Sequence, residues 1–254
     1  MCILIAEKQS SEKVAGQVAE FLIVDKHRPG CYHIYLYSVA FGCGRKAGAA
    51  RRRKVKLMKI CVYGAASNEI DQNYINIVED LCEKLAKRGH SLVFGAGNGG
   101  LMGAAARGFH KGGGEVTGVV PVFFQNEDIE PLYAECTKIL STPDMGTRKT
   151  IMEDLADAFV VAPGGIGTFD EFFQVLTLKQ LRQHNKPIAL FNINGYYYSV
   201  QALMHNSTEE KFLREDCLTL YECFSENQTD ELITYIEAPP VSVEEKSVKD
   251  LKYS

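Results

Sequence analysis

The sequence predicts an α/β protein, a three-layer sandwich in which helices cover both faces of a mostly parallel sheet. Three observations predict it. From residue 58 onward, short apolar runs alternate with patterns typical of amphipathic helices. The apolar runs are nearly continuous, as expected of strands that are buried on both faces. Glycine-rich turns follow several of the runs, which is where ligands bind in such sheets, at the carboxyl ends of the strands.

The expected elements follow one another at short intervals. Residues 59–64 (KICVYG) read as the first strand and residues 73–88 as the first helix. Val78 and Leu81 lie on one apolar stripe of that helix, and Gly89 ends it. The other strands are expected at 91–95, 115–121, 136–142, 157–163 and 186–192, and the other helices at 101–113, 146–156 and 168–182.

Composition excludes several other classes of protein. The chain has 254 residues, 46% hydrophobic and 24% charged, with 22 Gly and 8 Pro, which excludes a disordered, collagen-like or coiled-coil chain. No apolar run approaches the roughly 18 to 20 residues of a membrane-spanning helix. The 8 Cys occur singly, without CxxC or zinc-ligand spacing. We therefore expect reduced thiols in a cytoplasmic protein, and neither disulfides nor a metal site.

Charge divides the chain into two parts. Residues 1–57 carry 11 Lys and Arg against 4 Asp and Glu, a balance of +7, whereas the rest of the chain carries −11. The RRRK run at 51–54 could bind nucleic acid or a membrane surface, but lone basic runs are more often solvated linkers, so we expect neither partner. Met58 precedes the first buried strand as an initiator would. We expect residues 1–57 to be an extension outside the functional domain, residues 58–238 to form that domain and residues 239–254 to be a polar tail.

Two glycine-rich turns are candidates for binding a phosphate. The first, GAGNGG at 95–100, matches the G-x-G-x-x-G dinucleotide fingerprint. This turn follows the second strand, whereas the fingerprint follows the first strand of its fold. In addition, no Asp or Glu after the next strand is placed to bind a ribose. We therefore do not expect NAD or FAD. Small residues such as Gly97 and Gly99 would let the helix pack closely on the sheet while its N-terminus lines the ligand crevice.

The second turn, PGGIGT at 163–168, also lies between an apolar strand and a helix. Its glycines permit close approach of the backbone to a ligand, and the helix start offers unpaired N–H groups and a partial positive charge. These properties favour a phosphate, to which Thr168 could donate unless it caps the helix. The acidic pair Asp170-Glu171 would repel that phosphate. We expect Asp170 to stabilise the helix through its favourable interaction with the helix dipole. Glu171 could instead face a sugar.

A third segment completes a resemblance to a known family. Met145-x-x-Arg148-Lys149 followed by PGGIGT-x-x-Glu171 is similar to the paired signature of the LOG ("lonely guy") family, the cytokinin riboside 5′-monophosphate phosphoribohydrolases. The segments GAGNGGLMGA, LADAFVVAPGG and KPIALFNINGYY extend the resemblance over about residues 58–236. It implies a Rossmann-like fold, usually a homodimer or an assembly of dimers. It also implies hydrolysis of the N-glycosidic bond of a nucleoside 5′-monophosphate to free base and ribose 5-phosphate, without a metal or other cofactor.

The resemblance also implies roles for individual residues. Glu171 would hold the ribose and help to position or deprotonate the attacking water, and Arg148 would orient the nucleotide and Glu171. The chemistry agrees, because cleavage of a ribosyl C–N bond builds positive charge that a carboxylate stabilises, and an arginine keeps its own charge. The substrate-binding residues expected beside this catalytic pair are Lys149, Gly164, Gly165, Ile166, Gly167, Thr168 and Thr177, with Gly97 and Gly99 from the first turn.

The chain differs from the plant-type pattern at two positions. Gly146 stands where the family often has His, and Ile166 where it has Tyr. The family's acidic residue after the third strand has its counterpart in Glu127 or Asp128. The substrate could therefore be a cytokinin riboside 5′-monophosphate or AMP. An alternative function is a catalytically inactive nucleotide-binding or sensing module on the same fold.

Other polar and aromatic features are expected to be structural. His90, His110 and His184 are isolated in the sequence, and no order of Ser, His and Asp suggests acyl transfer. The aromatic run YYY at 196–198 is expected to pack against the sheet edge or a subunit interface.

Overall fold

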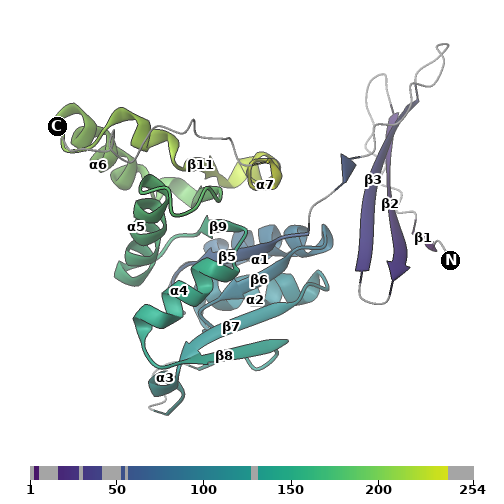
Figure 1. The fold of residues 1–254 in the computed structure, drawn as a ribbon, viewed down its shortest axis with the longest axis horizontal. Coiled ribbons are helices and arrows are strands. Elements are labelled where there is room, and N and C mark those ends of the chain that lie inside the picture. Colours follow the sequence, from purple (N-terminus) through teal and green to yellow (C-terminus); the bar gives the residue numbers. More distant parts are fainter. Residues whose placement is uncertain are drawn as a thin grey trace. The chain divides into compact units, whose positions relative to one another are not determined.

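The computed structural model describes residues 3–5, 17–28, 31–41, 53–54, 57–126 and 131–239 (Figure 1). It divides the chain into two compact units, Met1–Lys56 and Leu57–Ser254. The first unit contains a four-stranded sheet and the second a seven-stranded sheet. Glu127 and Asp128, and the predicted tail from residue 240 onward, lie outside the described residues.

The first unit is an antiparallel sheet with the strand order β1-β2-β3-β4. Its two long strands pair from Gln17 opposite Phe41 to Arg28 opposite Cys31, with a shift of register after Lys26. The sequences of both strands are rich in β-branched and aromatic residues, which favour extended structure. None of these strands was predicted from the sequence. The strands are β1 (Ile3–Ile5), β2 (Gln17–Arg28), β3 (Cys31–Phe41) and β4 (Arg53–Lys54).

The second unit is built on a parallel sheet with the order β11-β10-β9-β5-β6-β7-β8. All neighbouring strands in it pair in parallel. The chain runs outward from β5 to β8 and then returns for β9, β10 and β11 on the other side, so the order reverses between β5 and β9. Ligands bind at such a switch point. The strands are β5 (Lys59–Tyr63), β6 (Ser91–Phe94), β7 (Val116–Pro121), β8 (Lys138–Thr142), β9 (Ala158–Val161), β10 (Ile188–Asn192) and β11 (Glu222–Ser225).

Helices cover both faces of this sheet and complete the three layers (Figure 1). One buried cluster joins the sheet to α1, α2 and α7, and a second joins its other face to α4, α5 and α6. β5 contributes to both, with Ile60 and Val62 in the first and Cys61 and Tyr63 in the second. The helices are α1 (Gln72–Lys87), α2 (Gly100–Lys111), α3 (Val122–Asn126), α4 (Met145–Leu155), α5 (Ile166–Gln180), α6 (Tyr198–Glu209) and α7 (Thr229–Glu237), with 3-10 helices η1 (Ile193–Gly195), η2 (Glu215–Thr219) and η3 (Glu226–Gln228).

The structure confirms the predicted α/β sandwich and the strands and helices predicted between residues 59 and 192. Gly89 follows α1 with a φ of 89°, the left-handed conformation expected after a helix end. The elements beyond residue 192 were not predicted. In α6 only Met204 is buried, so this helix lacks a clear apolar stripe, and β11 is only 4 residues long.

An ion cluster connects the end of α7 to the loop before β6. Arg88 donates to both carboxylate oxygens of Glu237, at 2.6 Å each, and Nε2 of the buried His90 lies 2.8 Å from the same carboxylate. His90 Nδ1 accepts from the Met58 N–H at 3.3 Å, so Nε2 carries the ring proton and donates to Glu237. Burial alone would raise the pKa of Glu237, but the hydrogen bonds from Arg88 and His90 outweigh it and lower that pKa to about 2.

We expect Glu237→Gln to lower the free energy of unfolding by about 2 kcal/mol at pH 7, because Arg88 loses its anionic partner. A depressed pKa means that the ionised carboxylate stabilises the fold above about pH 4.5 and that this contribution is lost as the pH falls toward 2. Urea unfolding of wild type and variant at several pH values measures both effects. The control is Glu231→Gln, which removes an exposed carboxylate from the same helix. A difference between wild type and Glu237→Gln that stays constant down to pH 3 would contradict the assignment.

Candidate active site

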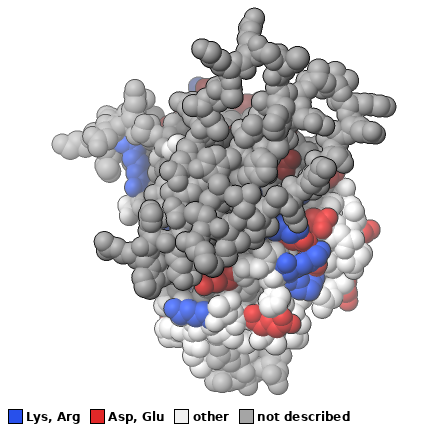
Figure 2. Space-filling view, turned by 90° about the vertical axis from the view of Figure 1, so that its right-hand side faces the viewer, with Lys and Arg blue, Asp and Glu red and all other residues white. Residues whose placement is uncertain are grey.

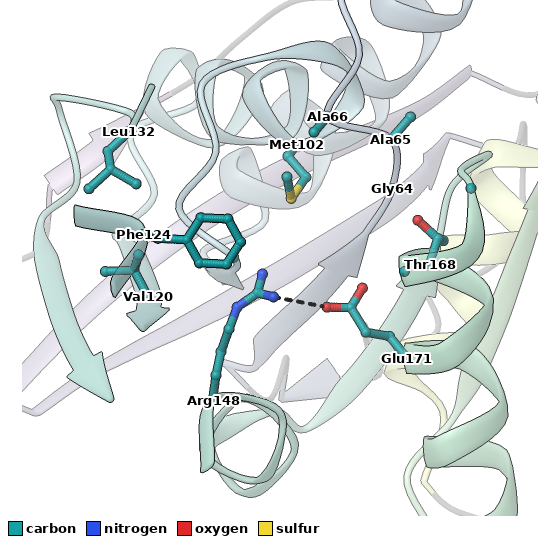
Figure 3. Close-up of a pocket in the computed structure, with 13 residues that line it drawn as sticks. Gly64, Ala65, Ala66, Met102, Val120, Phe124, Leu132, Arg148, Thr168 and Glu171 are labelled. Carbon is teal, nitrogen blue, oxygen red and sulfur yellow. Dashed lines mark ion pairs between the residues drawn. The ribbon is translucent and has the colours of Figure 1, made fainter. Parts of the chain in front are cut away.

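A pocket of about 220 Å³ lies at the carboxyl ends of the central strands, where the strand order reverses (Figure 3). The loop after β5 forms one wall through Gly64, Ala65 and Ala66. The start of α5 forms another, and α4 contributes Arg148. The glycine turns of the sequence therefore meet here, as predicted from the carboxyl-end rule for parallel sheets.

Arg148 enters the pocket from the first turn of α4. That helix begins after Asp144, whose carboxylate accepts from the Thr147 N–H at 2.8 Å and from its hydroxyl at 3.0 Å. The guanidinium is buried, and its Nε donates to the Val119 carbonyl at 3.2 Å. A Cβ at Gly95 would overlap the Arg148 guanidinium, so this glycine leaves space for it.

Glu171 faces Arg148 from α5, as Figure 3 shows. Its Oε1 lies 3.7 Å from Arg148 Nη1, and both side chains are almost fully buried. Burial raises the pKa of Glu171 to about 7, although the charge of Arg148 acts in the opposite direction. A carboxyl group with such a pKa exists in both protonation states near neutral pH and can therefore exchange protons with a ligand.

After the first glycine turn, the amides at the start of α2 donate hydrogen bonds to acceptors within the protein. The Ala65 carbonyl accepts from the N–H groups of Leu101 and Met102 at 2.7 and 3.2 Å, and Asn68 Oδ1 accepts from Gly100 N–H at 2.9 Å. Gly100 has a φ of 52° and lies against the Ala65 carbonyl. The start of α2 thus has its first amides paired, which supports close packing as the role of this turn.

The second glycine turn leaves its amides available. No side-chain cap covers the start of α5, and the first helical amide with an acceptor in the chain is that of Phe169, which donates to Gly165 O at 3.0 Å. Within the part of the chain that the structure describes, the N–H groups of residues 166–168 have no partner. Gly165, Gly167 and Thr168 line the pocket. The arrangement is suited to an anion at the N-terminus of a helix.

Three other predicted binding residues near this turn do not line the pocket. Gly164 lies behind Thr168, and a Cβ there would overlap the Thr168 side chain. Ile166 is 87% exposed. Lys149 forms an ion pair with Asp170 at 2.8 Å, which also gives Asp170 a partner that the sequence did not suggest. Their roles toward a ligand stay predictions.

The remaining predicted residues lie farther away. Thr177 is about 13 Å along the axis of α5 from Thr168, by the rise of an α-helix, and its hydroxyl donates to the Phe173 carbonyl at 2.7 Å. Gly97 pairs with Leu132 in an isolated bridge, and Gly99 precedes α2, where a Cβ would overlap the Ala66 carbonyl. Both glycines support the pocket wall from outside.

The apolar wall of the pocket was not predicted. Met102 and Phe124 lie on one side of Arg148, and Val120 and Leu132 extend this wall, away from Glu171 (Figure 3). A binding site therefore has one end with the free amides and one end suited to a flat apolar ring, and Arg148 and Glu171 lie between them. The only sequence signal for this wall is the position of Val120 at the end of a predicted strand.

Three other kinds of functional feature were sought among the described residues. None of their His, Cys, Asp and Glu side chains gather in threes as a metal site requires. None of their helices combines the length and apolar character needed to cross a bilayer. On the described surface visible in Figure 2, Lys and Arg lie next to Asp and Glu and do not form a patch of one sign.

Comparisons with known proteins identify similar sequences. Residues 102–236 match the model of a family described as possible lysine decarboxylase. A probable cytokinin riboside 5′-monophosphate phosphoribohydrolase of Arabidopsis thaliana, LOG6, is 34% identical over 169 residues, which are 66% of this chain and 83% of that protein. The cytokinin riboside 5′-monophosphate phosphoribohydrolase LOG of Oryza sativa subsp. japonica is 34% identical over 65% of this chain and 67% of its own length.

Solved structures show a similar fold. The molybdenum cofactor carrier protein of Chlamydomonas reinhardtii superposes with a TM-score of 0.55 over 72% of this chain and 100% of its own, at 19% identity. A molybdenum cofactor binding protein from Rippkaea orientalis gives a TM-score of 0.54, also at 19% identity. At this level of identity, the comparison supports the Rossmann-like fold alone.

Burial and the charge of Arg148 act in opposite directions on the pKa of Glu171, and their balance can be tested by titration. We expect a midpoint near pH 7, measured as the infrared carboxylate signal that is present in the wild type and missing from Glu171→Gln. Arg148→Ala should move the midpoint upward, because the positive charge that favours the ionised form is lost. Asp170→Asn, which removes a neighbouring negative charge, should move it downward. A midpoint below pH 5, or one that Arg148→Ala does not raise, would contradict this electrostatic account.

Proposed function

The chain belongs to the LOG family of cytokinin riboside 5′-monophosphate phosphoribohydrolases, and from this premise we propose how its pocket works. The protein hydrolyses the N-glycosidic bond of a nucleoside 5′-monophosphate and releases the free base and ribose 5-phosphate. It is therefore an N-glycosidase. Although the family description names a lysine decarboxylase, the similar proteins are named phosphoribohydrolases. Their activity favours the hydrolase over an inactive nucleotide-binding module.

The two ends of the pocket support one orientation of the nucleotide. The 5′-phosphate would accept from the free N–H groups at the start of α5 and from Thr168, where the helix dipole favours negative charge. The base would lie against the apolar wall that includes Met102 and Phe124. The ribose then lies between these two ends, next to Arg148 and Glu171. This pairing of an anion site with a buried cation and carboxylate is the observation on which the proposal rests.

The chemistry needs a carboxylate near the anomeric carbon. As the bond from C1′ to the base nitrogen breaks, its electrons leave with the base and positive charge develops on the ribose ring. Ionised Glu171 stabilises that charge and accepts a proton from the water whose oxygen bonds to C1′. The base nitrogen takes up a proton in exchange. A carboxyl group with a pKa of about 7 is suited to accept and then return a proton near neutral pH.

Arg148 acts as a fixed positive group in this scheme. Its guanidinium stays charged and is held by the Val119 carbonyl and by Glu171, so it keeps the Glu171 carboxylate pointing into the pocket. It would also donate to the ribose or phosphate of the nucleotide. The predicted residues outside the lining would act on the ligand indirectly, through the residues that line the pocket; they include Lys149, Gly164 and Ile166.

We further propose a cytoplasmic homodimer. The free thiols of Cys61, Cys82 and Cys217 are buried, which is typical of a reducing compartment. Among the described residues, Ile166 and Phe212 are large apolar side chains that are 87% and 86% exposed, and a second copy of the chain would cover such surface.

The base preference between a cytokinin and adenine depends on how the apolar wall accommodates an N6 substituent.

Glu171→Gln should reduce turnover by about a hundredfold or more, because the amide can neither carry negative charge nor accept the proton from water. The affinity for the nucleotide should remain largely unchanged. A chromatographic assay for free base and ribose 5-phosphate, with AMP and isopentenyladenosine monophosphate as substrates, measures turnover, and calorimetric titration measures affinity.

Asp170→Asn is the matched control, since Asp170 is the neighbouring carboxylate and pairs with Lys149 outside the pocket. It should retain most of the activity. A wild-type protein that binds AMP but releases no base would favour the inactive nucleotide-binding module. A Glu171→Gln variant with wild-type turnover would show that another residue carries the reaction.

A further inference from the structure

Three consecutive backbone carbonyls between β9 and α5 each accept a hydrogen bond from outside their own loop. The Tyr197 hydroxyl donates to the Ala162 carbonyl at 2.7 Å. The Ala65 N–H donates to the Pro163 carbonyl at 3.0 Å. The Tyr196 hydroxyl donates to the Gly164 carbonyl at 2.6 Å. The aromatic run was expected at a sheet edge or a subunit interface, but two of its hydroxyls hold the backbone that leads into the second glycine turn.

The direction of these carbonyls matters because a carbonyl oxygen carries partial negative charge and repels a phosphate. In a trans peptide the C=O of one residue and the N–H of the next point in opposite directions. The bond from Tyr196 to the Gly164 carbonyl therefore also fixes the direction of the Gly165 N–H. Gly165 lines the pocket, and its N–H has no acceptor among the described residues, so it is available to a ligand there.

Packing does not fix this part of the loop. A Cβ at Gly165 or at Gly167 would have no atom within 4 Å, so neighbouring side chains do not constrain these two residues. Glycine also leaves the backbone dihedral angles free. The hydrogen bond from Tyr196 is the one that the described residues make to the Gly164–Gly165 peptide itself.

Tyr197 is held in the core, and the ring of Tyr196 packs against it. Tyr197 is fully buried, its N–H donates to Asn192 Oδ1 at 2.7 Å, and its ring stacks edge-on against Tyr196 at 5.1 Å between centroids. Both follow η1, in which Asn194 and Gly195 have positive φ values of 52° and 73°. This tight turn directs the two rings toward the loop after β9.

We propose that Tyr196 is a positioning residue for recognition of the 5′-phosphate, and this inference rests on the proposed function. Its hydroxyl turns the Gly164 carbonyl away from the anion site and thereby presents the Gly165 amide to the phosphate. Tyr197 fixes the Ala162 carbonyl and the Tyr196 ring in the same way from the core. Tyr196 does not line the pocket, so it acts through the backbone and does not touch the nucleotide.

The test is Tyr196→Phe, which removes the hydroxyl and keeps the ring. Ribose 5-phosphate should bind about fivefold more weakly to this variant, which corresponds to about 1 kcal/mol, in the range of one hydrogen bond. The KM for AMP should rise by a similar factor with kcat nearly unchanged. Adenosine, which lacks the phosphate, should bind the variant as it binds the wild type in calorimetric titration, and this separates a role in phosphate recognition from a general loss of structure.

Tyr198→Phe is the matched control, because Tyr198 is 68% exposed and its hydroxyl makes no hydrogen bond with any described residue. It should bind ribose 5-phosphate as the wild type does. The proposal is overturned if Tyr196→Phe binds ribose 5-phosphate like the wild type, if Tyr198→Phe weakens binding equally, or if the affinities of Tyr196→Phe for adenosine and ribose 5-phosphate fall in parallel. It is also overturned if the wild type does not bind ribose 5-phosphate. A wild type that releases no base, while Tyr196→Phe alone weakens ribose 5-phosphate binding, would refute the hydrolase and support the role of Tyr196.

Discussion

The pairing of Arg148 with Glu171 is the constraint on which the rest of the pocket depends. Two opposite charges removed from water require each other, because either one alone would be buried without compensation. Their contact at 3.7 Å joins α4 to α5, and the Lys149–Asp170 pair next to it joins the same two helices at their surface. Glycine is needed at position 95 because a Cβ there would overlap the Arg148 guanidinium. The pair thus shapes the pocket, and the charge of Arg148 opposes the rise in pKa that burial causes at Glu171.

The two glycine turns show how similar sequences acquire different roles. Both follow a buried strand and begin a helix, but the amides at the start of α2 donate to Ala65 and Asn68, whereas those of residues 166–168 have no partner among the described residues. Unpaired helix amides favour an anion, while paired ones stabilise the fold. Whether the amides are paired depends on the residues that pack against each turn, and this cannot be predicted from the glycine pattern alone.

Local patterns predicted much of this protein and long-range contacts the rest. Apolar periodicity located the sheet and the helices up to residue 192. The glycines of the PGGIGT turn indicated a ligand-binding loop, and the resemblance to the LOG family pointed to Arg148 and Glu171, which line the same pocket as that turn. The apolar wall was missed because Met102 and Phe124 belong to different helices that meet only in the folded chain. The hydroxyls of Tyr196 and Tyr197 were also missed, because an aromatic run indicates burial but not which carbonyl a hydroxyl will meet. The antiparallel sheet of the first unit was not predicted, and the motifs that indicated the pocket all lie after residue 58.

The most direct measurement is a crystal structure of the Glu171→Gln variant with AMP, since the loss of turnover would preserve the intact nucleotide. The account predicts a 5′-phosphate within hydrogen-bond distance of the amides at the start of α5 and of Thr168. The side chain at 171 should lie beside C1′ and the base against Met102 and Phe124. A phosphate bound at residues 95–100, or a side chain at 171 turned away from the ribose, would contradict it.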